Sequence, residues 1–219
     1  MLNMTTVLSE GEGKYKLTFK FSDKWQVYKY DEPIKENFYN KFCKQSLKAV
    51  DFIAISENSV LFIEVKCVFS DNETSPLRFS ESDDNAIIKS LKEKLTEEES
   101  IAVKVSYKRP YLVEEISKKI KDTLIGLFAA YNNSDDRLSS FNKSIFVYKK
   151  PIIFVFFLER KGELNLPENF KPLASKLKTI IEQKVSFLGN IKVDVVNTHT
   201  LPTSLGIDVL AGSADEAIL

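Results

Sequence analysis

The stretch VDFIAISENSVLFIEVK, residues 50–66, determines how this sequence is interpreted. Two apolar runs rich in β-branched residues flank the polar tetrapeptide Ser56–Ser59, a pattern typical of a β-hairpin. If the two central residues of that tetrapeptide form the turn, Asp51 lies directly opposite Glu64, with their Cβ atoms about 4.5–5.5 Å apart. A turn one residue longer would place the two carboxylates on opposite faces, so the interpretation depends on the register.

Three charged side chains gather on one face of this predicted hairpin. Glu64 and Lys66 are two residues apart on one strand and therefore point to the same side, where Asp51 joins them from the other strand. Ile53 and Phe62 lie beside them. The opposite face is apolar and carries Val50, Phe52, Ala54, Leu61, Ile63 and Val65. Charges in strands that otherwise look buried are costly without partners, which marks this group as a candidate functional site.

The chemistry of these side chains suits metal-assisted hydrolysis. Two opposed carboxylates remain ionised together only if a cation lies between them. Carboxylate oxygens favour Mg²⁺ or Mn²⁺, and Mg²⁺ is commonly bound together with substrate phosphates. A lysine beside such a metal can orient a water molecule or stabilise charge that develops on a phosphate. The three residues therefore predict hydrolysis of a phosphodiester bond.

These residues resemble the motif of the PD-(D/E)XK nuclease superfamily, whose members have the restriction-endonuclease-like fold. The family pattern is an acid on one strand and Glu-x-Lys on the next. It is present as Val50-Asp51 and Glu64-Val65-Lys66, with valine in place of the family's proline. The resemblance implies that Asp51 and Glu64 are metal ligands and that Lys66 is the catalytic lysine. We expect the carbonyl oxygen of Val65 to be a third ligand.

Two further residues complete the predicted site. Families of this kind often place another acid on the helix before the first strand, which makes Glu36 the candidate metal ligand, ahead of Asp31 and Glu32. Lys119 lies next to the apolar stripe of a helix predicted over residues 111–131. It could lean toward the site or contact a nucleic-acid phosphate; the simpler alternative is a solvated lysine.

Hydropathy patterns along the chain predict one α/β domain with a mixed sheet flanked by helices. The alternating segments 14–21 and 25–30 predict an N-terminal β-hairpin. Helices are predicted over 31–42, 85–98, 111–131 and 167–188, and further strands over 101–105, 152–158 and 191–196. The order strand–helix–strand over 152–196 predicts a right-handed parallel crossover, which matches the closing half of the nuclease fold. We expect a hairpin extension over 1–30, a nuclease-like domain over 31–199 and a C-terminal tail over 200–219.

Composition excludes several other kinds of site. A single histidine argues against a His-based zinc centre or a Ser-His-Asp triad, and the seven glycines form no phosphate-binding loop. The two cysteines lack the spacing of a metal site or a disulfide framework, which favours reduced thiols and a cytoplasmic location. No apolar run reaches the roughly 18–20 residues of a membrane span, and we expect no signal peptide.

These observations together predict a Mg²⁺-dependent nuclease that acts on DNA rather than RNA, in restriction, anti-phage defence or repair. Acidic and basic residues are equal in number, 31 of each, which weakens the case for autonomous DNA binding and leaves room for a partner protein. Two alternatives stay open: a structural ion pair across the hairpin, and a catalytically silent nuclease-like subunit that binds a partner protein or DNA. The sequence does not decide between a monomer and a homodimer.

Overall fold

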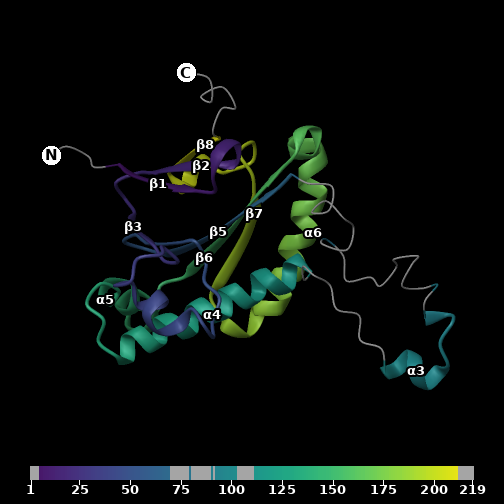
Figure 1. Ribbon diagram of the computed structural model, residues 1–219. Helices are drawn as coiled ribbons and strands as arrows, with labels where there is room; N and C mark the ends of the chain where they lie inside the picture. The colour runs from purple at the N-terminus through teal and green to yellow at the C-terminus, as the bar shows by residue number, and fades with distance from the viewer. Residues whose placement is uncertain (1–4, 70–78, 80–89, 91, 103–110, 212–219) are drawn as a thin grey trace.

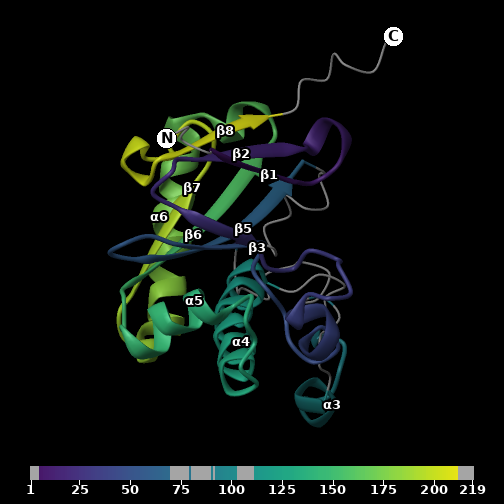
Figure 2. The ribbon, with the colours of Figure 1, turned by 90° about the vertical axis from the view of Figure 1, so that its left-hand side faces the viewer.

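The chain folds into three layers in the computed structural model, which describes residues 5–69, 79, 90, 92–102 and 111–211 (Figures 1 and 2). A three-stranded sheet lies over one face of a five-stranded sheet, and helices cover the other face. Each interface between layers has its own apolar core. The protein is therefore a mixed α/β protein built around the larger sheet.

The larger sheet contains both antiparallel and parallel pairs in the order β3-β4-β5-β6-β7. Its antiparallel part consists of β3 (Gln26–Lys29), β4 (Phe52–Ile55) and β5 (Val60–Val68). Strands β6 (Ile152–Arg160) and β7 (Ile191–Val196) continue the sheet in parallel. Strand β5 is thus central, with an antiparallel neighbour on one side and a parallel neighbour on the other, which explains why its residues are apolar on both faces.

The smaller sheet joins the two ends of the described chain. It is antiparallel, with the order β1-β2-β8, and consists of β1 (Thr6–Glu10), β2 (Leu17–Phe21) and β8 (Ile207–Ala211). The buried side chains Phe19 and Phe21 of β2 pack against Phe52 of the larger sheet. This layer therefore seals the apolar face of the β4–β5 hairpin.

Two long helices cover the opposite face of the larger sheet. They are α4 (Leu112–Asn132) and α6 (Pro167–Val185), and α6 connects the parallel strands β6 and β7 as predicted. Helices α3 (Glu97–Ala102) and α5 (Ser139–Asn142) are short. The remaining turns of helix are 3-10 or π segments: η1 (Gly13–Tyr15), η2 (Tyr39–Cys43), η3 (Lys143–Val147), η4 (Gly162–Asn165), η5 (Ser186–Leu188) and η6 (Thr203–Leu205). No helix in the described ranges has the length and apolar character needed to cross a membrane.

The predicted hairpin at β4 and β5 is confirmed, together with its register. Phe52 pairs with Ile63, and the backbone N–H of Asp51 donates to the carbonyl of Ile63 at 3.1 Å. The apolar face of the hairpin packs in the core beneath the three-stranded sheet. Val50 is an exception, since it lies in the core on the helical side. It precedes the first residue of β4, so the strict alternation of a strand does not extend to it.

The predicted N-terminal hairpin is wrong, because its two strands belong to different sheets. Strand β2 pairs with β1 and β8, whereas β3 is the edge strand next to β4. Between β2 and β3 the chain crosses from one layer to the other. The backbone N–H of Ser22 donates to the carbonyl of Gly206 at 2.9 Å and stabilises this crossing. The indole N–H of Trp25 donates to the carbonyl of Leu205 at 2.7 Å. Tertiary pairing with a distant strand has overridden the local turn signal.

Other predicted elements also differ. Strand β1 lies in the segment 1–13, which carries no strand prediction, and β8 lies in the predicted tail. The predicted helix over 31–42 is reduced to the π turn η2, because the Asn37 side chain bonds the backbone instead. It donates to the carbonyl of Tyr30 at 2.9 Å and accepts from the N–H of Tyr39 at 2.9 Å. Residues 101 and 102 of a predicted strand belong to α3, and its remaining residues fall outside the described ranges, as does most of the helix predicted over 85–98.

Candidate functional site

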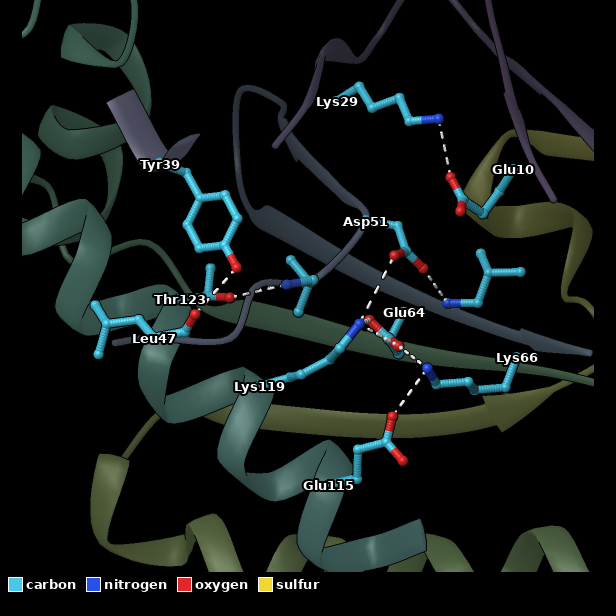
Figure 3. A network of polar contacts seen from close by, with 12 residues as sticks. Glu10, Lys29, Tyr39, Leu47, Asp51, Glu64, Lys66, Glu115, Lys119 and Thr123 are labelled. Atoms are coloured by element: carbon cyan, nitrogen blue, oxygen red, sulfur yellow. Dashed lines mark hydrogen bonds and ion pairs between the residues drawn. The ribbon is translucent and has the colours of Figure 1, made fainter. Parts of the chain in front are cut away.

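The two predicted carboxylates lie on the helical side of the hairpin, beneath α4 (Figure 3). Asp51 is 4% exposed and Glu64 is fully buried. The Oδ2 atom of Asp51 accepts a hydrogen bond from the backbone N–H of Val65 at 2.6 Å, and its carbonyl accepts from the N–H of Tyr30 at 2.9 Å. Asp51 is therefore fixed between β5 and the end of β3. Val65 contacts Asp51 through its backbone N–H, whereas the expected role of Val65 was to offer its carbonyl oxygen to a metal ion.

Lys119 places its ammonium group between these carboxylates (Figure 3). Its Nζ atom lies 2.6 and 2.7 Å from the two carboxylate oxygens of Glu64 and 3.8 Å from Oδ1 of Asp51. Only 13% of the side chain is exposed, so the alternative of a solvated lysine is wrong. One turn along α4, Thr123 accepts from the backbone N–H of Val50 at 3.1 Å, which holds this part of the helix against the hairpin.

Lys66 also points toward Glu64, as the spacing predicted. Its Nζ atom is 3.3 Å from Oε1 of Glu64 and 2.9 Å from Oε1 of Glu115 on α4. Burial by itself lowers the pKa of Lys66, but the charges of Glu64 and Glu115 outweigh it, and the net pKa is raised. Lys66 is therefore a cation at neutral pH, suited to binding or stabilising negative charge rather than to accepting a proton.

A second group of acids meets at Asp51. Carboxylate oxygens of Glu10, Asp31 and Asp51 lie within 4.8 Å of one another. Asp31 follows β3, and Glu10 at the end of β1 lies 2.9 Å from the ammonium of Lys29. The Oδ1 atom of Asp31 is buried and has no hydrogen-bond partner in the described part of the chain. Such an orphaned oxygen is a candidate ligand atom for a cation.

Glu36, the acid that the sequence favoured, is exposed and lies outside this cluster. The prediction depended on a helix over 31–42, and that helix does not form. Asp31 takes the position instead because it lies two residues after the end of β3, the strand that pairs with β4 beside Asp51. Glu10 carried no signal in the sequence, since β1 was not predicted. The structure thus gathers Asp51, Glu64 and Lys66 as the hairpin register predicted, and it brings Lys119, for which two alternatives were open, to the same place. The additional acids are Asp31 and Glu10 and not Glu36.

The site is short of positive charge. The carboxyl pKa values of Asp31, Asp51 and Glu64 are all raised, in each case chiefly by burial. Repulsion from Glu64 adds to the rise at Asp51, and repulsion from Glu10 adds to that at Asp31. Within the described ranges, the carboxylates of Glu10, Asp31, Asp51 and Glu64 face three ammonium groups, those of Lys29, Lys66 and Lys119. Lys66 also pairs with Glu115, so the carboxylates outnumber the ammonium groups available to them.

A pocket of about 460 Å³ opens onto this network. Asp51 and Glu64 are not among its lining residues, but their ion-pair partners Lys66 and Lys119 are. Its lining residues are Asp31, Tyr39, Lys44, Lys48, Ala49, Lys66, Glu115 and Lys119. No signal in the sequence indicated Glu115, and Lys44 and Lys48 are exposed lysines that also line this pocket. Their positions depend on how the segment after η2 packs against α4, which no local pattern reveals.

We compared the chain with protein-family models, with curated proteins and with solved structures, and no match was found. The chemistry of the site is therefore inferred from its own residues.

Proposed function

We propose that the protein is a divalent-metal-dependent nuclease with a restriction-endonuclease-like core. The observation that carries the proposal is the buried, undercompensated carboxylate cluster behind a pocket with four lysines in its lining. Buried carboxylates that outnumber the neighbouring ammonium groups are what a divalent cation would stabilise. The mixed sheet, with a helical crossover between its last two strands, further supports this fold.

The residues present fit Mg²⁺ or Mn²⁺. Asp51 would hold the ion with the orphaned Oδ1 atom of Asp31, which takes the place expected for Glu36, and Glu10 belongs to the same group of acids. Glu64 lies outside that group and would be the further ligand that the resemblance implies. A bound ion of this kind would act as a Lewis acid toward a phosphate and lower the pKa of bound water. Lys119 occupies the space between the two carboxylates and would have to move aside when the ion binds.

The two lysines of the site supply positive charge where a phosphodiester would react. Lys66 carries a stable positive charge and lines the pocket, so its N–H groups can bind a phosphate oxygen and stabilise charge that develops there. Glu115 orients this ammonium at 2.9 Å. Once released from Glu64, Lys119 is a second cation at the same place. DNA is the proposed substrate by analogy with the fold, as is a role in restriction, anti-phage defence or repair.

Cleavage assays test the proposal. Supercoiled plasmid, linear duplex, single-stranded DNA and RNA are incubated with Mg²⁺, Mn²⁺ or EDTA, for wild type, Glu64→Ala and Lys66→Ala. Lys178→Ala is the control, since Lys178 pairs with Asp194 at 3.0 Å on β7. We expect metal-dependent cleavage by wild type and the control, and at least a roughly 100-fold loss in both site variants, as for removal of one electrostatic group. Absence of cleavage by wild type, or cleavage that survives both substitutions, would contradict the proposal.

The position of Lys119 favours a second candidate, a catalytically silent nuclease-like subunit. An ammonium 2.6 Å from Glu64 already neutralises part of the charge, as in a purely structural ion pair. Such a subunit would bind its partner protein or DNA after loss of Glu64, and calorimetric titration with Mn²⁺ would give no binding. Heat of binding in wild type that disappears in Glu64→Ala would favour the nuclease instead.

A further inference from the structure

We propose that Lys44 and Lys48 form a phosphate-binding subsite at the same pocket, so that the protein takes a phosphodiester chain rather than a single phosphate. This inference rests on the proposed function for the class of substrate. It goes beyond it by assigning residues that hold the chain away from the reacting bond.

The four lysines that line the pocket fall into two kinds. The ammonium groups of Lys66 and Lys119 point toward Glu64 and form ion pairs with it. Lys44 and Lys48 are exposed, and neither has an ion pair with a carboxylate in the described ranges. Two lysines without acidic partners in a pocket beside buried acids are available to an anionic ligand.

The backbone that carries these two lysines is fastened to the same helix as the site. The N–H of Lys48 donates to Oδ2 of Asp122 on α4 at 2.8 Å, and the hydroxyl of Tyr39 donates to the carbonyl of Leu47 at 3.0 Å. Lys119 is one turn of α4 before Asp122. Lys48 and the carboxylate site are therefore both anchored to α4, and Lys44 lies in the same hydrogen-bonded segment as Lys48, so little backbone ordering is needed when a ligand binds both.

The chemistry of the pocket favours a polymer of phosphates over a small anion. One phosphate at the carboxylate site would contact Lys66 and Lys119, leaving Lys44 and Lys48 without a role. A nucleic-acid strand places a charge at every nucleotide, so its neighbouring phosphates can reach both sets of lysines. Contacts of this kind position the strand and carry no sequence information. They also provide a local basic footprint in a chain whose formal net charge is zero.

Binding of labelled oligonucleotides in EDTA tests this inference without cleavage. Fluorescence anisotropy is measured for a single strand and a duplex over a series of KCl concentrations, with wild type and the double variant Lys44→Gln/Lys48→Gln. The control is Lys171→Gln/Lys176→Gln, which removes the same charge from exposed positions on α6. Loss of two phosphate contacts should reduce the slope of log K against log [KCl] by about 1.4 for single strands and 1.8 for duplex.

We expect at least tenfold weaker binding at low salt in the pocket variant, and wild-type binding in the control. An unchanged slope, an equal loss in the control, or no binding by wild type would overturn the inference. Its failure is distinguishable from failure of the nuclease proposal. Metal-dependent cleavage with an unaffected salt slope removes only the subsite, whereas a reduced slope without any cleavage leaves a nucleic-acid-binding protein that is not a nuclease.

Discussion

Replacing Lys119 by methionine removes the cation that holds the carboxylate pair together. Methionine keeps much of the length of the side chain but leaves Glu64, which is fully buried, with only Lys66 at 3.3 Å. Loss of one partner from a buried ion pair costs about 3–5 kcal/mol. Because Lys66 remains, we expect the lower end, about 3 kcal/mol, in the free energy of unfolding measured by urea denaturation in EDTA.

Divalent metal should reverse most of this loss. An ion that binds only the folded state at about 100 times its dissociation constant adds about 2.7 kcal/mol. In Lys119→Met the carboxylates are free to take the ion, so Mn²⁺ should restore stability nearly to that of wild type. In wild type the ion must displace an ammonium 2.6 Å from Glu64, so the same Mn²⁺ concentration should add less.

Lys118→Met is the matched control for this experiment. The ammonium of Lys118 pairs with Asp122 at 2.9 Å, but 55% of the side chain is exposed, so its loss should cost about 0.3–0.5 kcal/mol and leave the response to Mn²⁺ as in wild type. Two results would refute the reasoning. One is a Lys119→Met protein as stable as Lys118→Met in EDTA; the other is a Lys119→Met protein that is destabilised as expected but gains nothing from Mn²⁺.

Three further predictions concern stability in EDTA, each measured by urea denaturation. Burial, and then repulsion from Glu64, raise the pKa of Asp51, so the free energy of unfolding should fall as pH rises from about 4 through that raised pKa. Asp51→Asn should flatten this pH dependence. An unchanged pH dependence in the variant would contradict the raised pKa of Asp51. A Cβ at Gly126 would lie 2.6 Å from the buried, unbonded hydroxyl of Tyr30, so Gly126→Ala should cost about 1–2 kcal/mol. Adding Tyr30→Phe should recover the loss, and strict additivity would argue against the clash. Asn197→Ala should lower the free energy of unfolding by about 3 kcal/mol, because this fully buried amide donates to the backbone carbonyl and to the side-chain oxygen of Asn165. A decrease below about 1 kcal/mol would mean that water replaces these hydrogen bonds in the variant.

The sequence predicted the β4–β5 hairpin because its information is local. The spacing of Asp51, Glu64 and Lys66 around a short turn defines one register, and the observed pairing follows it. The same holds for α4, whose stripe of apolar residues was sufficient to predict the helix and to put Lys119 next to that stripe, although the contact of Lys119 with Glu64 stayed one of two alternatives. In these segments, local pattern and tertiary packing favour the same structure.

The remaining parts of the site depend on contacts between distant segments. Glu10 reaches Asp51 only because β1 pairs with β2 in another layer, and no periodicity in residues 1–13 indicates that pairing. Glu36 was favoured over Asp31 on the assumption of a helix that the side chain of Asn37 replaces with local hydrogen bonds. The polar side chain that ended the helix therefore also changed which acid faces the site.

The position of β2 between β1 and β8 also sets an order for folding during synthesis. Strand β8 leaves the ribosome after every other described element, so until then one edge of β2 has no partner and Trp25 lacks the carbonyl of Leu205. Pairings between segments this far apart form late. The layer that carries Glu10 would thus be completed only after all the other described elements have been synthesised. Until then the apolar face of the β4–β5 hairpin would lack part of the sheet that covers it.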